Sequence, residues 1–82
     1  MVMFLAPGAG DIVVVASRRV GGAVERNRAR RILREAWREI HPQAKEGFDA
    51  VAVAKEAVRG AKTQDLVAEM TELLRRAGKV RA

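Results

Sequence analysis

Apolar residues along the chain fall into three short runs and two longer stretches with helical spacing. The short runs cover residues 2–5, Ile12–Ala16 and Phe48–Ala54, and each predicts a β-strand. Because Ile12–Ala16 does not alternate with polar residues, we expect that strand to be buried on both faces. Residues 7–11, between the first two runs, are dense in turn formers, and this predicts a hairpin.

The two longer stretches predict helices. Ala23–Ile40 has the strongest helical pattern, and it ends before Pro42 because the residue preceding a proline avoids the α region. In the second stretch, Thr63 is predicted as the N-cap and Gly78 as the glycine that follows the helix. The order β-β-α-β-α indicates an α+β fold. Packing both helices on one face of a small sheet is its economical arrangement.

The predicted helix over 23–40 separates its polar and apolar side chains. At about 100° per residue, one side carries an apolar stripe of Ala29, Ile32, Leu33, Ala36, Trp37 and Ile40. Another side carries a basic stripe, which we define as Asn27, Arg30, Arg31, Arg34 and Arg38. The sector between them is a mixed edge of Glu25, Arg28, Glu35 and Glu39. The apolar stripe can therefore pack on the sheet while the basic stripe stays outside.

Positive charge is concentrated in this part of the chain. Residues 18–38 hold eight arginines and no lysine, which is half of the sixteen Lys and Arg residues in the 82-residue sequence. The formal net charge is +6, and the pI is about 11.1. A small, strongly basic chain is typically drawn to polyanions, most often nucleic acid. The length predicts a single domain over residues 1–82.

Arginine suits a phosphate-rich partner better than lysine does. Its planar guanidinium binds phosphate in a bidentate manner and stacks on bases, and each neutralised phosphate releases a counterion. Asn27, within the basic stripe, can both donate to and accept from a 2′-hydroxyl or a base edge. The alternative is an ordinary solvated surface with intrahelical ion pairs, such as Glu35 with Arg31 or Arg38.

Other chemistries have little support in the sequence. There is no cysteine, which excludes disulfides and thiolate zinc sites and fits a reducing cytoplasm. Residues 1–6 are too short for a signal segment, and no run approaches the roughly 20 apolar residues of a membrane span. We therefore expect a soluble, cytoplasmic protein. With a single histidine and scattered aspartates, neither a metal site nor a catalytic constellation is expected.

Several residues have two interpretations. Ser17 either caps the end of its strand or contacts phosphate together with the two arginines that follow it, and these are about equally supported. Gly21 and Gly22 favour a tight strand-to-helix turn over a phosphate cradle. Trp37 is expected in the core rather than stacked on a base, and His41 is expected to favour the helix dipole.

The sequence from Ser17 to Arg38, SRRVGGAVERNRARRILREAWR, resembles the signature of the bacterial ribonuclease P protein subunit. In that family a strand ends in Ser and two basic residues, followed by a Val/Ile-Gly turn and Ala-Val-x-Arg-Asn-Arg-x-(Arg/Lys)-Arg. A Leu-Arg-Glu-(Ala/Ser)-aromatic-Arg segment then completes the signature. Because Phe48–Ala54 and the amphipathic last helix fit the same order, the resemblance covers residues 2 to 77.

The resemblance implies a ribosomal protein S5 domain 2-like α-β sandwich with a left-handed βαβ crossover, against the general right-handed rule. It implies an RNA-binding subunit of ribonuclease P, an endoribonuclease whose catalytic RNA holds Mg²⁺ and removes the 5′ leader from precursor tRNA. The protein would bind no cofactor and supply no catalytic residue, and its partners would be ribonuclease P RNA and precursor tRNA. The RNA-binding residues implied are Ser17, Arg18, Arg19, Arg26, Asn27, Arg28, Arg30, Arg31, Arg34 and Arg38.

The chain departs from the family pattern at its start. Family members usually begin with an N-terminal helix that encloses, with the sheet, a cleft for the single-stranded leader, whereas Met1 here falls at or inside the first strand. The leader contact is therefore not carried over with the rest. One face of the sheet is expected to be uncovered, exposing either Val13 and Val15 or Ile12 and Val14. That face predicts a homodimer, with strand exchange as one form, or poor solubility.

Two other functions remain open from the sequence. The arginine-rich helix would also serve a general nucleic-acid or ribosome-associated binding protein. A basic amphipathic helix is typical of membrane-surface proteins as well, although the apolar stripe is needed here for the core.

Overall fold

The structure, a computed structural model that describes residues 1–81, has the predicted element order. Three 3₁₀ turns accompany the strands and helices: η1 (Arg18–Val20), η2 (His41–Gln43) and η3 (Glu56–Val58). The other elements are β1 (Val2–Pro7), β2 (Ile12–Ala16), α1 (Ala23–Ile40), β3 (Phe48–Ala54) and α2 (Thr63–Arg76). The predicted bounds of β2, α1 and β3 are confirmed, and β1 extends two residues beyond its prediction.

The hairpin predicted for the first two strands is wrong, because β3 lies between them. The sheet order is β1-β3-β2, with β1 antiparallel to β3 and β2 parallel to it. The turn formers between β1 and β2 instead cross the end of β3, where the Gly8 N–H donates to the Gly47 carbonyl at 3.0 Å. The Asp49 carboxylate accepts from the N–H groups of Gly10 and Asp11, both at 2.9 Å. The central strand β3 thus holds in place the segment that the sequence predicted to be a hairpin turn.

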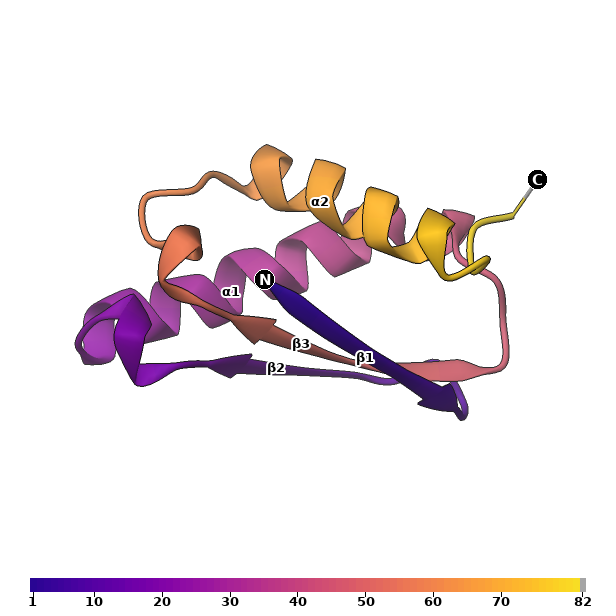
Figure 1. Cartoon of the computed structure of the whole chain (residues 1–82), viewed down its shortest axis with the longest axis horizontal. Helices are drawn as coiled ribbons and strands as arrows, with labels where there is room; N and C mark the ends of the chain where they lie inside the picture. Colours follow the sequence, from indigo (N-terminus) through magenta and orange to yellow (C-terminus); the bar gives the residue numbers. More distant parts are fainter. Residues whose placement is uncertain (82) are drawn as a thin grey trace.

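Both helices lie on one face of the sheet, as predicted (Figure 1). The inner face of β3 consists of Phe48 and three alanines, Ala50, Ala52 and Ala54, all between 0 and 3% exposed. Alanine side chains allow the helices to approach the central strand closely. A single connected core joins this face to the apolar stripe of α1 and to Leu66, Met70 and Leu74 of α2.

The opposite face of the sheet carries none of the described helices (Figure 1). The prediction that β2 is buried on both sides is therefore wrong: Val14 is buried, but Val13 and Val15 are 55% and 42% exposed. Strand register places the outward residues in two rows, which we call the open face: Val2, Val53 and Val15, then Phe4, Val51 and Val13. Of the two alternatives for exposure, the structure has the pair Val13 and Val15.

The ends of α2 follow standard capping chemistry, shifted by one residue at the start. Lys62, not the predicted Thr63, is the N-cap, and its N–H donates to the Asp65 carboxylate at 2.9 Å. At the other end Gly78 has a φ of +72°, which confirms the predicted glycine after the helix. Residues 79–81 then run beside residues 43–45, joined by backbone hydrogen bonds.

Candidate nucleic-acid interface

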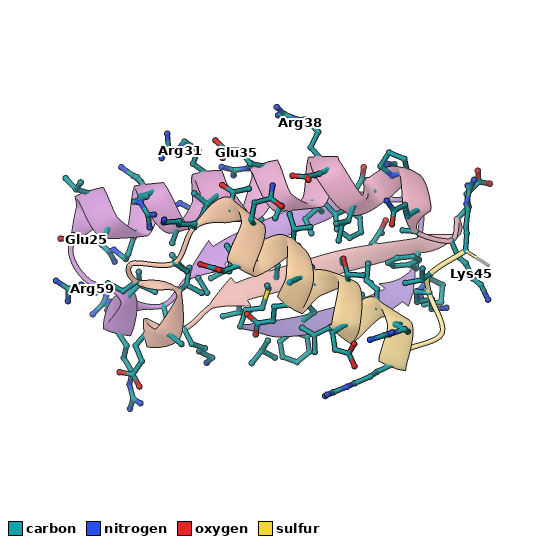
Figure 2. The ribbon with its side chains drawn as sticks, turned by 90° about the horizontal axis from the view of Figure 1, so that it is seen from above. Glu25, Arg31, Glu35, Arg38, Lys45 and Arg59 are labelled. Atoms are coloured by element: carbon teal, nitrogen blue, oxygen red, sulfur yellow. The ribbon has the colours of Figure 1, made fainter. Side chains whose placement is uncertain are left out.

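The two stripes of α1 are separated in the structure as the helical wheel predicts. All six residues of the apolar stripe are buried, between 0 and 6% exposed. In the basic stripe, Asn27, Arg31, Arg34 and Arg38 are exposed and Arg30 is half-buried. Arg26, which lies beside the apolar stripe, is also half-buried. Arg31 and Arg38 point away from α2 and from the sheet (Figure 2). The basic stripe is thus an outer surface of the molecule.

Few of these charges are compensated within the chain. Arg31 approaches Glu35 at 3.9 Å in an exposed i,i+4 pair, a type that contributes little in water. Arg30 donates to the side-chain oxygen of Asn27, which is neutral. Among residues 1–81, Arg34 and Arg38 have no carboxylate within salt-bridge distance. The buried Nε of Arg26 has no hydrogen-bond acceptor in that part of the chain either.

The mixed edge has a structural role instead, because it docks α2 and the loop that precedes it. Arg28 donates to the Ala61 carbonyl at 2.6 Å. About two turns further along α1, the Glu35 carboxylate accepts from the Thr63 hydroxyl at 2.9 Å. Gln64 donates to Glu39 at 3.0 Å. Glu35 and Glu39 are thereby held toward α2, and the basic stripe contains no carboxylate.

Arg28 is consequently unlike the other residues in the predicted RNA-binding set. Its guanidinium is half-buried and fixes the chain before α2, so it stabilises the fold whether or not it also meets RNA. Its position on the mixed edge was visible on the helical wheel, but its partner lies 33 residues away.

The η1 turn places Ser17, Arg18 and Arg19 at the start of α1. The Ser17 hydroxyl accepts from the Arg19 N–H at 3.2 Å, so Ser17 caps the start of η1, directly after β2. Arg18 and Arg19 are exposed, and buried Val20 anchors the turn. Gly21 has a φ of +142°, so the tight strand-to-helix turn is confirmed. Contact of this turn with phosphate stays a prediction.

Two aromatic residues behave differently at the other end of α1. Trp37 is 6% exposed and packs edge-on against Phe48 at 6.2 Å between ring centroids, which confirms its place in the core. His41 follows α1 as its C-cap residue, with its ring exposed and 5.5 Å from that of Trp37.

One exposed apolar residue beside the basic stripe was missed. Val24, in the first turn of α1, is 80% exposed. On the helical wheel it falls next to Arg31, at about 160° from Arg26. A valine on the polar side of an amphipathic helix is the signal that singles it out.

Residues 1–81 bring together no group of three His, Cys, Asp or Glu side chains that could hold a metal ion. None of the helices in this range is long and apolar enough to cross a membrane.

A mixed three-stranded sheet, helices on one face and an outward row of arginines form a small basic α+β protein, with a surface composition that is typical of the nucleic-acid-binding class. Comparison with known proteins narrows that class. The family model described as "Ribonuclease P" matches residues 1–78, and the chain belongs to this family.

Individual relatives agree with this membership. The chain is 48% identical over 64 residues to the ribonuclease P protein component of Chloroflexus aurantiacus, covering 77% of this chain and 47% of that protein. It is 41% identical over 63 residues to that of Symbiobacterium thermophilum, covering 77% of this chain and 55% of the relative. The chain therefore spans about half the length of the curated relatives it matches.

Solved structures share the fold. The RNase P protein from Thermotoga maritima superposes with a TM-score of 0.76 at 21% identity, over 90% of this chain and 74% of that one. The Staphylococcus aureus RNase P protein gives 0.71 at 19% identity, over 98% and 75%. The α+β fold with its mixed three-stranded sheet is thus that of RNase P proteins.

Proposed function

We propose that this chain is the RNA-binding protein subunit of ribonuclease P. In this role it assists a catalytic RNA in removing the 5′ leader from precursor tRNA, in the cytoplasm. The chemistry resides in the RNA, which holds the Mg²⁺, and the protein supplies no catalytic residue and no cofactor of its own. Family membership supports the role. The observation that carries it is the basic stripe, where Arg34 and Arg38 are exposed without carboxylate partners among residues 1–81.

The proposed contact surface combines the basic stripe with the η1 turn. RNA backbone following α1 would meet Arg18 and Arg19 at one end and Arg38 at the other. Each neutralised phosphate releases counterions, so the arginines replace part of the cation atmosphere that a folded RNA needs. Arg28 belongs to this surface through its motif, with a contribution limited by its bond to Ala61.

Reconstitution with a bacterial ribonuclease P RNA tests this function. At a magnesium concentration where the RNA alone is slow, adding the chain should speed 5′ leader removal by roughly tenfold, which corresponds to about 1.4 kcal/mol in the activation barrier. A general nucleic-acid or ribosome-associated binding protein would instead bind many RNAs tightly and give no stimulation. That result would favour the alternative function.

We also propose that the open face mediates association between two copies of the chain. Phe4 and Val13 are 60% and 55% exposed, and register places them in one row across Val51. A contiguous apolar patch of this kind favours association in water. The resemblance implies that this face of the sheet forms one wall of the leader cleft, so RNA and a second copy would compete for it.

Sedimentation over a range of concentrations should show a dimer for the wild-type chain and a monomer for Val13→Lys, because the lysine places a charge on the open face in a residue that is 55% exposed. Val24→Lys makes the same chemical change on α1, away from the sheet, and should leave the dimer intact. A wild-type chain that stays monomeric at high concentration would refute the association.

Two features of the fold are proposed on the same basis. We propose that residues 1–82 form one domain, which the single connected core supports. We propose that the β2–α1–β3 crossover is left-handed, as the resemblance implies. Seen from the helix side, with β2 and β3 turned to point upward, β3 lies to the left of β2, and this arrangement supports the left-handed sense (Figures 1 and 2).

A further inference from the structure

An open hollow of about 350 Å³ lies where α1 ends, directly beside the basic stripe. Its apolar lining comes from Ile12, Trp37 and Pro42, and its basic lining from Arg34 and Arg38. We call it the terminal hollow. Arg34 and Arg38 of the basic stripe therefore adjoin an apolar surface as well as solvent.

The aromatic part of the terminal hollow is held in place from behind. Trp37 is fixed by the core, since it packs against Phe48 and is 6% exposed. The exposed His41 ring stands 5.5 Å from it, with the two planes inclined by 54°. An exposed ring whose neighbour cannot move offers a firm surface for stacking.

The loop between β1 and β2 forms part of the wall of the hollow. Gly10 lines it with a φ of +100°. A Cβ atom at this position would lie 3.9 Å from His41 Nε2, which places the loop and the imidazole next to each other at the hollow. The Asp49 carboxylate holds this loop through the Gly10 N–H at 2.9 Å.

The terminal hollow thus joins two kinds of recognition within one site. Planar and apolar side chains bind an unstacked base, and guanidinium groups without carboxylate partners bind phosphate. A base-paired stretch of RNA offers phosphates but no free base face. A single unpaired nucleotide offers both, and its charge complements Arg34 and Arg38.

We propose that the terminal hollow binds one unpaired nucleotide of the RNA that follows the basic stripe. The base lies against the His41 ring and the apolar lining, while its phosphates meet Arg34 and Arg38. The inference rests on the proposed RNA-binding function and adds a site that distinguishes unpaired from paired RNA.

Two hairpin RNAs of equal length test the site, one fully paired and one with a single bulged adenosine. We expect the wild-type chain to bind the bulged hairpin about five- to tenfold more tightly, within the range for stacking of one base. His41→Ala should reduce that ratio to near one. Gln43→Ala, an exposed residue of the same η2 turn outside the hollow, should keep it. Binding is measured by fluorescence anisotropy of the labelled RNA.

A second measurement needs no variant. The sequence has one tryptophan and no tyrosine, so intrinsic fluorescence reports on Trp37 at the hollow. The bulged hairpin should quench or shift this emission, and the paired hairpin should leave it nearly unchanged.

The outcomes distinguish failure of the nucleotide site from failure of the proposed RNA-binding function. Equal, salt-dependent binding of both hairpins, with unchanged Trp37 emission, would overturn the nucleotide site while leaving RNA binding intact. Binding of neither hairpin would overturn the proposed function together with the site. A preference for the bulged hairpin that survives in His41→Ala, with no change in Trp37 emission, would place the base elsewhere and also overturn the site.

Discussion

Replacing Leu33 with alanine should lower the free energy of unfolding by about 2–5 kcal/mol. Leu33 is 0% exposed and lies at the centre of the apolar stripe, so truncation leaves a cavity between α1 and the rest of the core. A small domain has a total stability on the order of 5–15 kcal/mol, and this loss is a large part of it. Urea unfolding followed by circular dichroism would measure it.

Val24→Ala is the matched control for that change. Val24 lies on the same helix but is 80% exposed, so its truncation should alter stability by less than about 0.5 kcal/mol. If the two variants unfolded at the same urea concentration, the assignment of the apolar stripe to the core would be wrong.

Replacing both Arg34 and Arg38 with alanine should make RNA binding much less sensitive to salt. If the wild-type chain neutralises about five or six phosphates, log affinity falls with log salt at a slope of roughly −4 to −5. Each lost phosphate contact reduces the slope by about one unit. Between 50 and 200 mM salt, the wild-type affinity should therefore fall about 500-fold and that of the double variant about 30-fold. Filter binding over a salt series measures both.

A second double variant separates local contact from overall charge. Arg75 and Arg76 lie on α2, and both are paired with Glu72. Arg75→Ala/Arg76→Ala lowers the formal net charge from +6 to +4, the same change as in the stripe variant. Its salt slope should stay at the wild-type value. Equal losses in the two variants would show that net charge, not the basic stripe, governs binding.

The elements of the fold could be predicted because each leaves a local pattern in the sequence. Ala23–Ile40 has helical periodicity over its whole length, and Phe48–Ala54 is a short apolar run bounded by polar residues, so the predicted bounds agree with the structure. Strand pairing leaves no such local pattern. The turn formers between β1 and β2 predicted a hairpin, but β3, which follows much later in the chain, takes the central place between them.

The same distinction between local and distant information holds for the candidate interface. The basic stripe follows from spacing alone, and its exposure is confirmed at Asn27, Arg31, Arg34 and Arg38. The bond from Arg28 to Ala61 and the terminal hollow could not be predicted, since both depend on segments brought together by folding. Ile12 and Trp37 meet at that hollow from elements 25 residues apart in the chain.

The three alanines on the inner face of β3 bear on where RNA can reach the protein. Ala50, Ala52 and Ala54 are at most 1% exposed, so a larger side chain at any of them would have to displace a helix packed on the sheet. A shift of α1 would move the basic stripe relative to the loop at Gly10. Substitutions at these three buried positions would therefore change how the protein recognises RNA, although none of them contacts RNA or alters a charge.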